Sequence, residues 1–284
     1  MLSKFNYLKP KSLGEAISYL QENPGTKLLA GGTDLMILLR RNMIQVQHVL
    51  DIKSIPETKR FEFVDGLGLY IGASITINEI SEDEIITKKY NAIKQAADSL
   101  ASYQLRNRAT LVGNICNASP GADMASPLLV YDAIVKIAGP NGEREVAFEQ
   151  FYTGFKKTVL EPGELVIGIV LPDHAADDRS VFLKQARVKG HDLGIAGVSV
   201  RINSEKKVSV AMTAVAPTPV RLRELESMLA SKPFNSETAE WLGEEIKNHI
   251  KPISDIRSSA EYRLHVSGVL AARGMNQLIE MGGN

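Results

Sequence analysis

The chain has 284 residues, enough for one large domain or two to three small ones, and its 33 basic residues balance 33 acidic ones. This charge balance gives no net electrostatic field that favours nucleic acid or an anionic membrane. No apolar run reaches membrane-span length, and the N-terminal residues lack the apolar segment of a secretory signal. We therefore expect a cytoplasmic protein. Cys116 is the only cysteine, which excludes a disulfide framework, a cysteine-based zinc site and an iron–sulfur cluster on this chain alone.

The first fifty residues alternate helix and strand signals. Ser12 and Glu15 form a capping-box pattern ahead of an amphipathic run. The predicted elements are a helix at 16–20, a strand at 27–30, a helix at 35–41 and a strand at 48–52. Together they predict a compact β-α-β unit with a helix in front.

Between residues 56 and 171, short strands and turns dominate. The run Gly139-Pro140-Asn141-Gly142 between two apolar segments is typical of a hairpin. The predicted elements are strands at 68–71, 74–77, 135–138, 144–147 and 165–171, and a helix at 91–102.

A polar bridge at residues 174–179 is the best candidate for a domain boundary. The elements predicted after it are antiparallel strands at 181–188, 195–202 and 208–215, then helices at 221–230, 236–249 and 257–281. Because the chain contains no long βαβαβ series, a doubly wound Rossmann sheet is not expected.

The turn Ala30-Gly31-Gly32-Thr33-Asp34 lies between a predicted strand and a predicted helix. Such a junction points backbone N–H groups at a common spot, where the helix dipole adds partial positive charge. Paired glycines let a phosphate approach the backbone without a Cβ in the way. The turn is therefore interpreted as a phosphate cradle, typically for a dinucleotide.

A second glycine motif runs from Thr110 through Gly113 and Asn114 to Asn117 and Asp123. Its amides and hydroxyls can donate to phosphate or flavin carbonyl oxygens, and its carboxylate can accept from a ribose or ribityl hydroxyl. The alternative for either motif is a loop whose polar groups satisfy their own backbone. Neither motif matches a P-loop or the G-x-G-x-x-G fingerprint.

Taken together, these motifs resemble the FAD-binding subunit of molybdenum hydroxylases, a family that includes xanthine, carbon monoxide and nicotinate dehydrogenases. The resemblance spans nearly the whole chain in order. The matching segments are residues 27–35, 104–114, 117–123, 182–187, 214–219 and 255–263.

The resemblance implies an α+β fold with an FAD-binding domain of the p-cresol methylhydroxylase or vanillyl-alcohol oxidase type, made of two α+β subdomains. A smaller C-terminal domain with a three-stranded antiparallel sheet and helices would follow. The implied domains are 1–175, with subdomains of about 1–55 and 56–175, and 176–284.

The resemblance also implies non-covalently bound FAD, with its pyrophosphate on the first turn and its flavin along the second motif. A lysine near flavin N1 and O2 would stabilise the negative charge of reduced flavin. No catalytic or metal-binding residue is expected on this chain. The implied cofactor-binding residues are Lys27, Leu28, Leu29, Ala30, Gly31, Gly32, Thr33, Asp34, Thr110, Gly113, Asn114, Asn117, Asp123, Leu165 and Lys184.

In this family, substrate is oxidised at molybdenum on a large molybdopterin subunit, and electrons pass through [2Fe-2S] clusters of a small subunit to FAD. The resemblance thus implies the electron-transfer flavoprotein of a heterotrimer, with NAD⁺ or another acceptor and no nucleic-acid partner. Segments closest to bacterial xanthine dehydrogenase subunits favour xanthine or purine oxidation. No cysteine-rich insertion follows Asn117, which argues against a relative with an extra cluster.

Two alternatives remain open from the sequence. One is a stand-alone flavin reductase on the same fold, and the other is an assembly or binding subunit without FAD. Val112, which stands where the family usually has the first of two glycines, is the only feature that favours the second alternative. Phe155 stands where relatives often carry a tyrosine, so stacking on flavin or nicotinamide would remain while the hydroxyl is lost.

The other candidate groups have simpler explanations. The five histidines lack metal-ligand spacing, and we expect small-residue packing for Cys116. Arg106 and Arg108 could bind phosphate or lie on the surface near a subunit contact.

Overall fold

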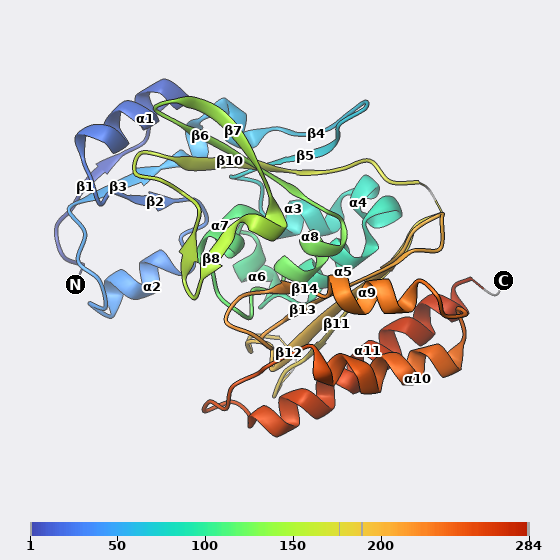
Figure 1. The fold of residues 1–284 in the computed structure, drawn as a ribbon. Coiled ribbons are helices and arrows are strands. Elements are labelled where there is room, and N and C mark those ends of the chain that lie inside the picture. Colours follow the sequence, from blue (N-terminus) through green and yellow to red (C-terminus); the bar gives the residue numbers. More distant parts are fainter. Residues whose placement is uncertain (1, 176, 189, 283–284) are drawn as a thin grey trace.

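The computed structural model describes residues 2–175, 177–188 and 190–282. We refer to the described residues before and after position 176 as the N-terminal half and the C-terminal half. Figure 1 shows two sheets at one end, a group of short helices in the middle, a further sheet and an outer layer of helices.

A three-stranded parallel sheet opens the chain, with strand order β1-β3-β2. It confirms the predicted β-α-β unit and adds an unpredicted strand, β1. Ser12 accepts a hydrogen bond from the Glu15 backbone, but the Glu15 carboxylate accepts from Lys11, so the predicted capping box is only half formed. The elements are β1 (Asn6–Leu8), α1 (Leu13–Glu22), β2 (Lys27–Leu29), α2 (Leu35–Arg40), β3 (His48–Asp51) and 3₁₀ helices at Ile52–Ser54 and Pro56–Lys59.

A five-stranded antiparallel sheet follows, with strand order β4-β5-β10-β6-β7. The predicted hairpin at 139–142 is confirmed, since Gly139 pairs with Gly142. Every residue of the central strand β10 is buried. The strands are β4 (Phe61–Val64), β5 (Gly68–Gly72), β6 (Ile134–Gly139), β7 (Gly142–Ala147) and β10 (Leu165–Leu171), and a separate hairpin pairs β8 (Tyr152–Gly154) with β9 (Lys157–Thr158).

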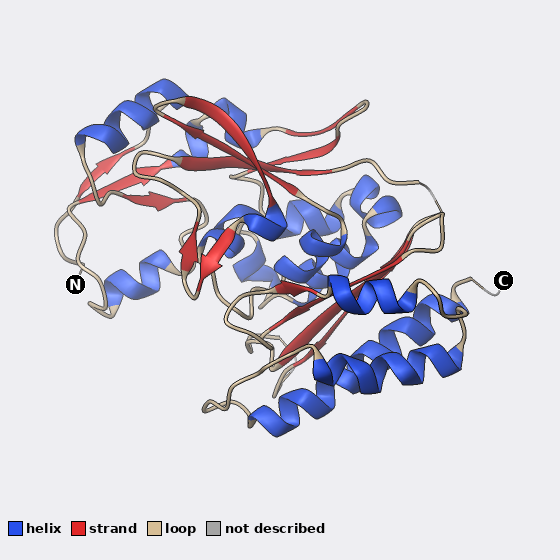
Figure 2. Ribbon diagram, in the orientation of Figure 1, coloured by secondary structure: helices blue, strands red, loops and turns tan. Residues whose placement is uncertain are grey.

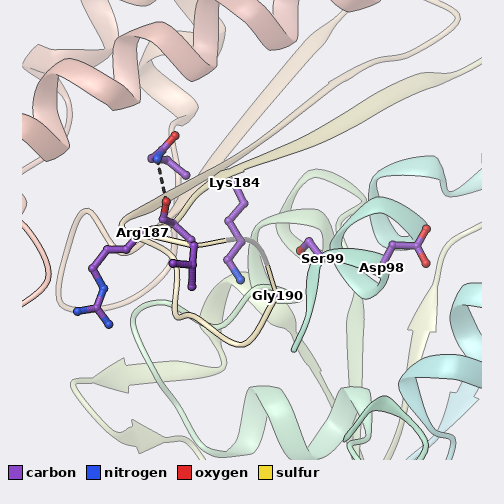
Figure 3. Close-up of a pocket in the computed structure, with 8 residues that line it drawn as sticks. Asp98, Ser99, Lys184, Arg187 and Gly190 are labelled. Carbon is purple, nitrogen blue, oxygen red and sulfur yellow. Dashed lines mark hydrogen bonds between the residues drawn. The ribbon is translucent and has the colours of Figure 1, made fainter. Parts of the chain in front are cut away.

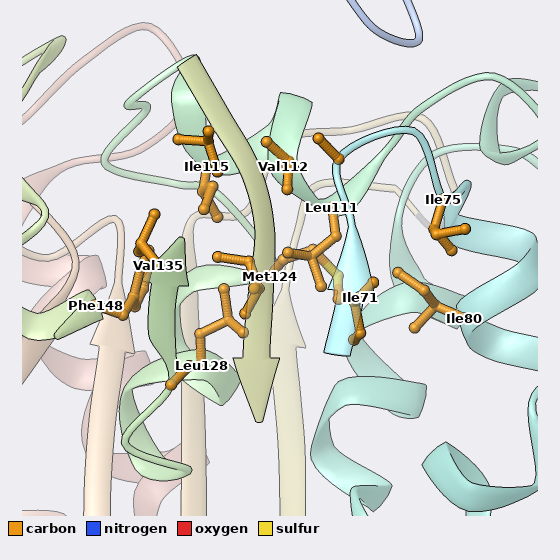
Figure 4. Close-up of a cluster of buried hydrophobic side chains, with 14 of the residues drawn as sticks. Ile71, Ile75, Ile80, Leu111, Val112, Ile115, Met124, Leu128, Val135 and Phe148 are labelled. Carbon is orange, nitrogen blue, oxygen red and sulfur yellow. The ribbon is translucent and has the colours of Figure 1, made fainter. Parts of the chain in front are cut away.

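Short helices fill the middle of the molecule. The strand predicted at 74–77 is wrong, because Thr76 and Glu79 form a complete capping box that begins helix α3. In Figure 4, Val112 and Ile115 of α7 lie in one apolar cluster with Met124. The helices are α3 (Ile77–Glu82), α4 (Glu84–Lys89), α5 (Asn91–Ser99), α6 (Tyr103–Arg106), α7 (Leu111–Cys116) and α8 (Ala125–Val130), with a 3₁₀ helix at Phe148–Gln150.

The C-terminal half contains the three expected antiparallel strands and a two-residue fourth, in the order β11-β12-β13-β14. Figure 2 shows these strands between two groups of helices. Several predicted ends shift; for example, the last helix begins at residue 260 rather than 257. The elements are β11 (Arg179–Gln185), β12 (Ala196–Ile202), β13 (Val208–Thr213), β14 (Val220–Arg221), α9 (Arg223–Leu229), α10 (Ser236–Glu245), a 3₁₀ helix at Ile246–Asn248 and α11 (Ala260–Glu280).

The two faces of this C-terminal sheet serve different cores. Strand side chains alternate between faces, so Val181 packs with the C-terminal helices whereas Phe182 packs in the core of the N-terminal half. Ser199 follows the same rule and bonds Ser126 of α8 at 3.0 Å. The alternation therefore turns Lys184, two residues after Phe182, towards the N-terminal half.

Within the described ranges, no helix is long and apolar enough to span a membrane. The same residues contain no group of three or more His, Cys, Asp or Glu side chains that could hold a metal ion.

Candidate functional site

The glycine turn leaves a run of backbone donors unused. The N–H groups of Gly31, Gly32, Thr33, Asp34 and Leu35 donate to no acceptor among the described residues, and the first helical bond runs from Met36 to the Gly32 carbonyl at 3.0 Å. Gly32 has φ +75°, and Asp34 makes no capping bond with its side chain. Successive unpaired N–H groups at such a turn suit an anion with several oxygens, such as a diphosphate.

Gly31 joins this turn to the segment that leads into the second motif. A Cβ on Gly31 would lie 2.0 Å from the Arg108 carbonyl oxygen and 3.0 Å from Ala109 Cα. Glycine is therefore required here by the approach of the protein's own backbone. The structure thus brings together the two motifs that the sequence separates by about 80 residues.

The second motif forms the short helix α7 and the loop after it. Thr110 is its N-cap, with Oγ1 accepting from the Gly113 N–H at 2.9 Å. The hydroxyl therefore uses one of its two lone pairs in the cap and keeps its proton for another acceptor. Asn114 Oδ1 accepts from the Met124 N–H at 3.4 Å. Asn117 ends the helix, and both its oxygens accept from the Lys156 ammonium.

Asp123 and Lys184 form an ion pair with Nζ 2.7 Å from Oδ2, and both side chains are less than a tenth exposed. Burial raises the pKa of the Asp123 carboxyl, while the neighbouring ammonium acts to lower it. The sequence predicted that each side chain contacts the cofactor, but not that they contact each other. One carboxylate oxygen of Asp123 is therefore already occupied, which leaves Oδ1 for a ligand hydroxyl.

Open space adjoins this ion pair. A pocket of about 470 Å³ is bounded by Lys184 and the loop after β11 on one side and by Asp98 and Ser99 of α5 on the other (Figure 3). The Asp192 carboxylate links the two ends of this loop, because it accepts hydrogen bonds from the backbone N–H and the guanidinium of Arg187.

The remaining predicted residues differ in burial and in their contacts. Leu28 and Leu29 lie in β2 and are half-buried, whereas Lys27, at the start of β2, is exposed. Ala30 follows β2, and its carbonyl accepts from Lys53 at 2.9 Å. Leu165 begins β10 and is fully buried, and no described contact joins it to the turn.

The two departures from the family pattern have different surroundings. The side chain of Val112 is 4% exposed and packs into the apolar cluster of Figure 4. Phe155, at the tip of the β8–β9 hairpin, is 64% exposed. The Phe155 ring is therefore available for stacking, whereas the Val112 side chain is part of the hydrophobic core.

Two lysines near the site were missed by sequence reasoning. Lys53 pairs with Asp51 at 2.8 Å as it holds the Ala30 carbonyl, and Lys156 reaches Asn117 from the hairpin tip. Neither lysine belongs to a local sequence motif, because each contacts a site residue at least 23 positions away in the sequence. Gly154 could have indicated a hairpin turn, and such a turn would have placed Lys156 at its tip.

Other candidate groups have structural roles. Arg106 donates to Asn78 and to the carbonyls of Asp98 and Leu100, which accounts for its guanidinium. Burial raises the pKa of the Cys116 thiol to about 12, so it stays protonated at neutral pH, in agreement with the packing role expected for it.

Two family models cover nearly the whole chain. The model described as “FAD binding domain in molybdopterin dehydrogenase” matches residues 3–174, and the model described as “CO dehydrogenase flavoprotein C-terminal domain” matches residues 181–278. The glycine turn, the second motif and Asp123 lie within the first match, and Lys184 lies within the second.

Individual relatives match over the same length. The chain is 32% identical to the xanthine dehydrogenase FAD-binding subunit of Escherichia coli O157:H7, covering 98% of this chain and 97% of that protein. It is 31% identical to the carbon monoxide dehydrogenase medium chain of Hydrogenophaga pseudoflava, covering 96% of each. Among solved structures, carbon monoxide dehydrogenase from Hydrogenophaga pseudoflava superposes with a TM-score of 0.92 at 30% identity over 97% of both chains.

Proposed function

This chain belongs to the family of FAD-binding medium subunits of molybdenum hydroxylases, and on that premise we propose that it conducts electrons from iron–sulfur clusters of a partner subunit, through FAD, to NAD⁺ or another acceptor. The observation that carries the proposal is the run of unused N–H groups from Gly31 to Leu35, within the part of the chain that matches the FAD-binding domain. FAD supplies the redox chemistry when bound, and the protein supplies position and charge.

Different segments of the chain bind different parts of FAD in this proposal. In the proposed arrangement, the N–H groups of residues 31–35 hold the diphosphate, and α7 with the loop to Asp123 flanks the flavin. Lys184 then presents its ammonium to the flavin from the C-terminal half, steadied by Asp123 at 2.7 Å. A fixed cation at that place would stabilise negative charge that develops on the flavin as it gains electrons.

We propose xanthine or a related purine as the substrate of the assembled enzyme, oxidised on the large molybdopterin subunit. The support is the similarity to the Escherichia coli xanthine dehydrogenase FAD-binding subunit, and the similarity to carbon monoxide dehydrogenase medium chains supplies the competing substrate. In this arrangement, the chain and the large and small subunits form a heterotrimer, and the substrate never contacts this chain.

The test is a visible spectrum of the chain purified alone and with the proteins that co-purify with it. We expect flavin absorption from the chain alone, and additional iron–sulfur absorption from the complex. A colourless chain that takes up no added FAD would overturn the proposal. Reduction of NAD⁺ by the complex, compared between xanthine, other heterocycles and carbon monoxide, then decides the acceptor and the substrate.

A further inference from the structure

Lys53 contacts the backbone at the start of the glycine turn. Strands β2 and β3 are parallel neighbours, with Leu29 paired to Asp51, so the residues that follow the two strands meet at one edge of the sheet. Ala30 follows β2, and Lys53 lies in the 3₁₀ helix that follows β3. There the Lys53 ammonium donates to the Ala30 carbonyl at 2.9 Å. The fold therefore places a charged donor directly on the peptide that begins the turn.

A buried carboxylate fixes the position of this ammonium. Asp51 Oδ1 lies 2.8 Å from Lys53 Nζ and accepts from the Lys53 N–H at 3.0 Å, and Asp51 Oδ2 accepts from the Tyr7 hydroxyl of β1 at 2.6 Å. The Asp51 side chain is 5% exposed. Burial acts to raise the pKa of the Asp51 carboxyl, but the hydrogen bonds from Lys53 and Tyr7 lower it below its usual value. Asp51 therefore stays ionised at neutral pH and holds Lys53 against the Ala30 carbonyl.

The Ala30 carbonyl belongs to the same peptide unit as the Gly31 N–H, the first of the unused donors in the turn. This peptide is trans, so its carbonyl and its N–H point in opposite directions. A donor that fixes the carbonyl therefore also fixes the direction of the Gly31 N–H. A cation on the carbonyl further polarises the peptide, which makes its N–H a stronger hydrogen-bond donor.

We propose that Lys53 is a positioning residue that binds the Ala30 carbonyl and so directs the Gly31 N–H to the diphosphate of FAD. This inference rests on the proposed position of FAD in the turn. Because Asp51 neutralises the charge of Lys53, the contribution comes from the direction and strength of the N–H donor rather than from long-range attraction. Without the ammonium, the peptide is free to rotate in the unliganded chain, and ordering it on binding costs affinity.

The test compares three probes on the full chain after removal of FAD: FAD itself, ADP and riboflavin. ADP carries the diphosphate without the flavin, and riboflavin carries the flavin without a phosphate. In Lys53→Met, we expect the Kd of FAD and of ADP to rise about tenfold and the Kd of riboflavin to stay unchanged. Because the lost effect is one of position, the ratio of the ADP Kd of the variant to that of the unaltered chain should be equal at about 0.1 M and about 1 M salt.

Lys53→Met also leaves the buried Asp51 carboxylate unpaired, which lowers stability. The double variant Asp51→Asn/Lys53→Met removes that charge and should bind ADP as weakly as Lys53→Met. Lys59→Met is the matched control, since Lys59 is exposed and ends the next 3₁₀ helix, and it should bind ADP as the unaltered chain does.

Three outcomes would overturn the inference. The first is that a folded variant without Lys53 binds ADP as Lys59→Met does. The second is that riboflavin binding weakens as much as ADP binding, which would indicate a general structural defect. The third is that the ratio of ADP Kd values falls to about one at high salt, which would indicate direct attraction of the anion. If the unaltered chain binds no FAD, the proposed function itself fails.

Discussion

At Gly32 the backbone has φ +75°, and a Cβ would come within 2.7 Å of Leu29 Cδ1. Neighbouring Gly31 has no such dihedral but lies against the Arg108 carbonyl. The pair of glycines was recognisable from the sequence as a site of close approach. The sequence does not reveal that Gly32 is needed for its backbone conformation and Gly31 for close packing, because the packing partner of Gly31 lies far along the chain.

Replacing Gly32 by valine should abolish retention of FAD while the C-terminal half stays folded. A β-branched residue at positive φ is strained, and relief of that strain would turn the N–H groups away from their common focus. Gly25→Val is the matched control, because Gly25 has φ +85° but open space around it and lies outside the turn. Flavin absorption per protein after gel filtration is the measurement; equal FAD content in the two variants would refute the placement of the diphosphate.

The Asp123–Lys184 pair should show strong energetic coupling. Removing one partner leaves a buried, unpaired charge, so Asp123→Asn or Lys184→Met alone should cost about 3 kcal/mol in the free energy of unfolding. The double variant has no such charge and should lose less than the sum of the single losses. Urea unfolding of the FAD-free chain measures all three; strictly additive losses would mean that the pair is not coupled in solution.

On the scale of helices and strands, local patterns predicted most elements correctly. The hairpin at 139–142 and the antiparallel strands of the C-terminal half follow from turn residues and apolar runs that act over short distances. The strand predicted at 74–77 is wrong because Thr76 and Glu79 form reciprocal hydrogen bonds that begin a helix at Ile77. The division into domains at residues 174–179 stays a prediction.

The candidate site was less predictable than its elements. Residue types in the glycine turn and in the second motif indicated ligand binding. The contacts that organise them, such as Gly31 with Arg108 and Asp123 with Lys184, join distant segments and leave no periodic signal. Lys156 was missed for the same reason.

Helix α7 depends on its cap at Thr110. Thr110→Ala removes the acceptor for the Gly113 N–H and should lower the free energy of unfolding by about 1 kcal/mol. Thr110→Ser keeps the hydroxyl oxygen and should restore most of that loss. Chemical denaturation of both variants without FAD separates this structural role from any contact with the cofactor; equal stability of the two would show that the cap contributes little.

Across the whole molecule, the junction between the two halves is polar and buried. Arg201 of β12 donates to the Val130 carbonyl at 3.1 Å and to His174 Nδ1 at 2.7 Å, and it also pairs with Asp178. His174 Nε2 lies 3.3 Å from the Tyr131 carbonyl oxygen. Because Nδ1 accepts from a guanidinium, the imidazole at this junction is neutral, with its proton on Nε2.

This arrangement makes the contact between the halves sensitive to acid. Burial and, after it, Arg201 lower the pKa of His174 below its usual value near 6.5, although Asp178, the Tyr131 carbonyl and Asp132 oppose the shift. The unfolded chain therefore takes up a proton at higher pH than the folded chain. The stability that depends on neutral His174 is complete above the unfolded pKa and is lost as the pH falls below it.

The chain should accordingly lose stability between about pH 7.5 and about pH 5.5, and His174→Gln should lose less over the same interval. Glutamine does not titrate, and its amide oxygen can still accept from Arg201, so the variant isolates the protonation of one group. The urea midpoint at the two pH values, for each protein, gives the comparison, in which the contributions of all other titrating residues cancel. An identical pH dependence in the two proteins would mean that the imidazole is not held neutral between the halves.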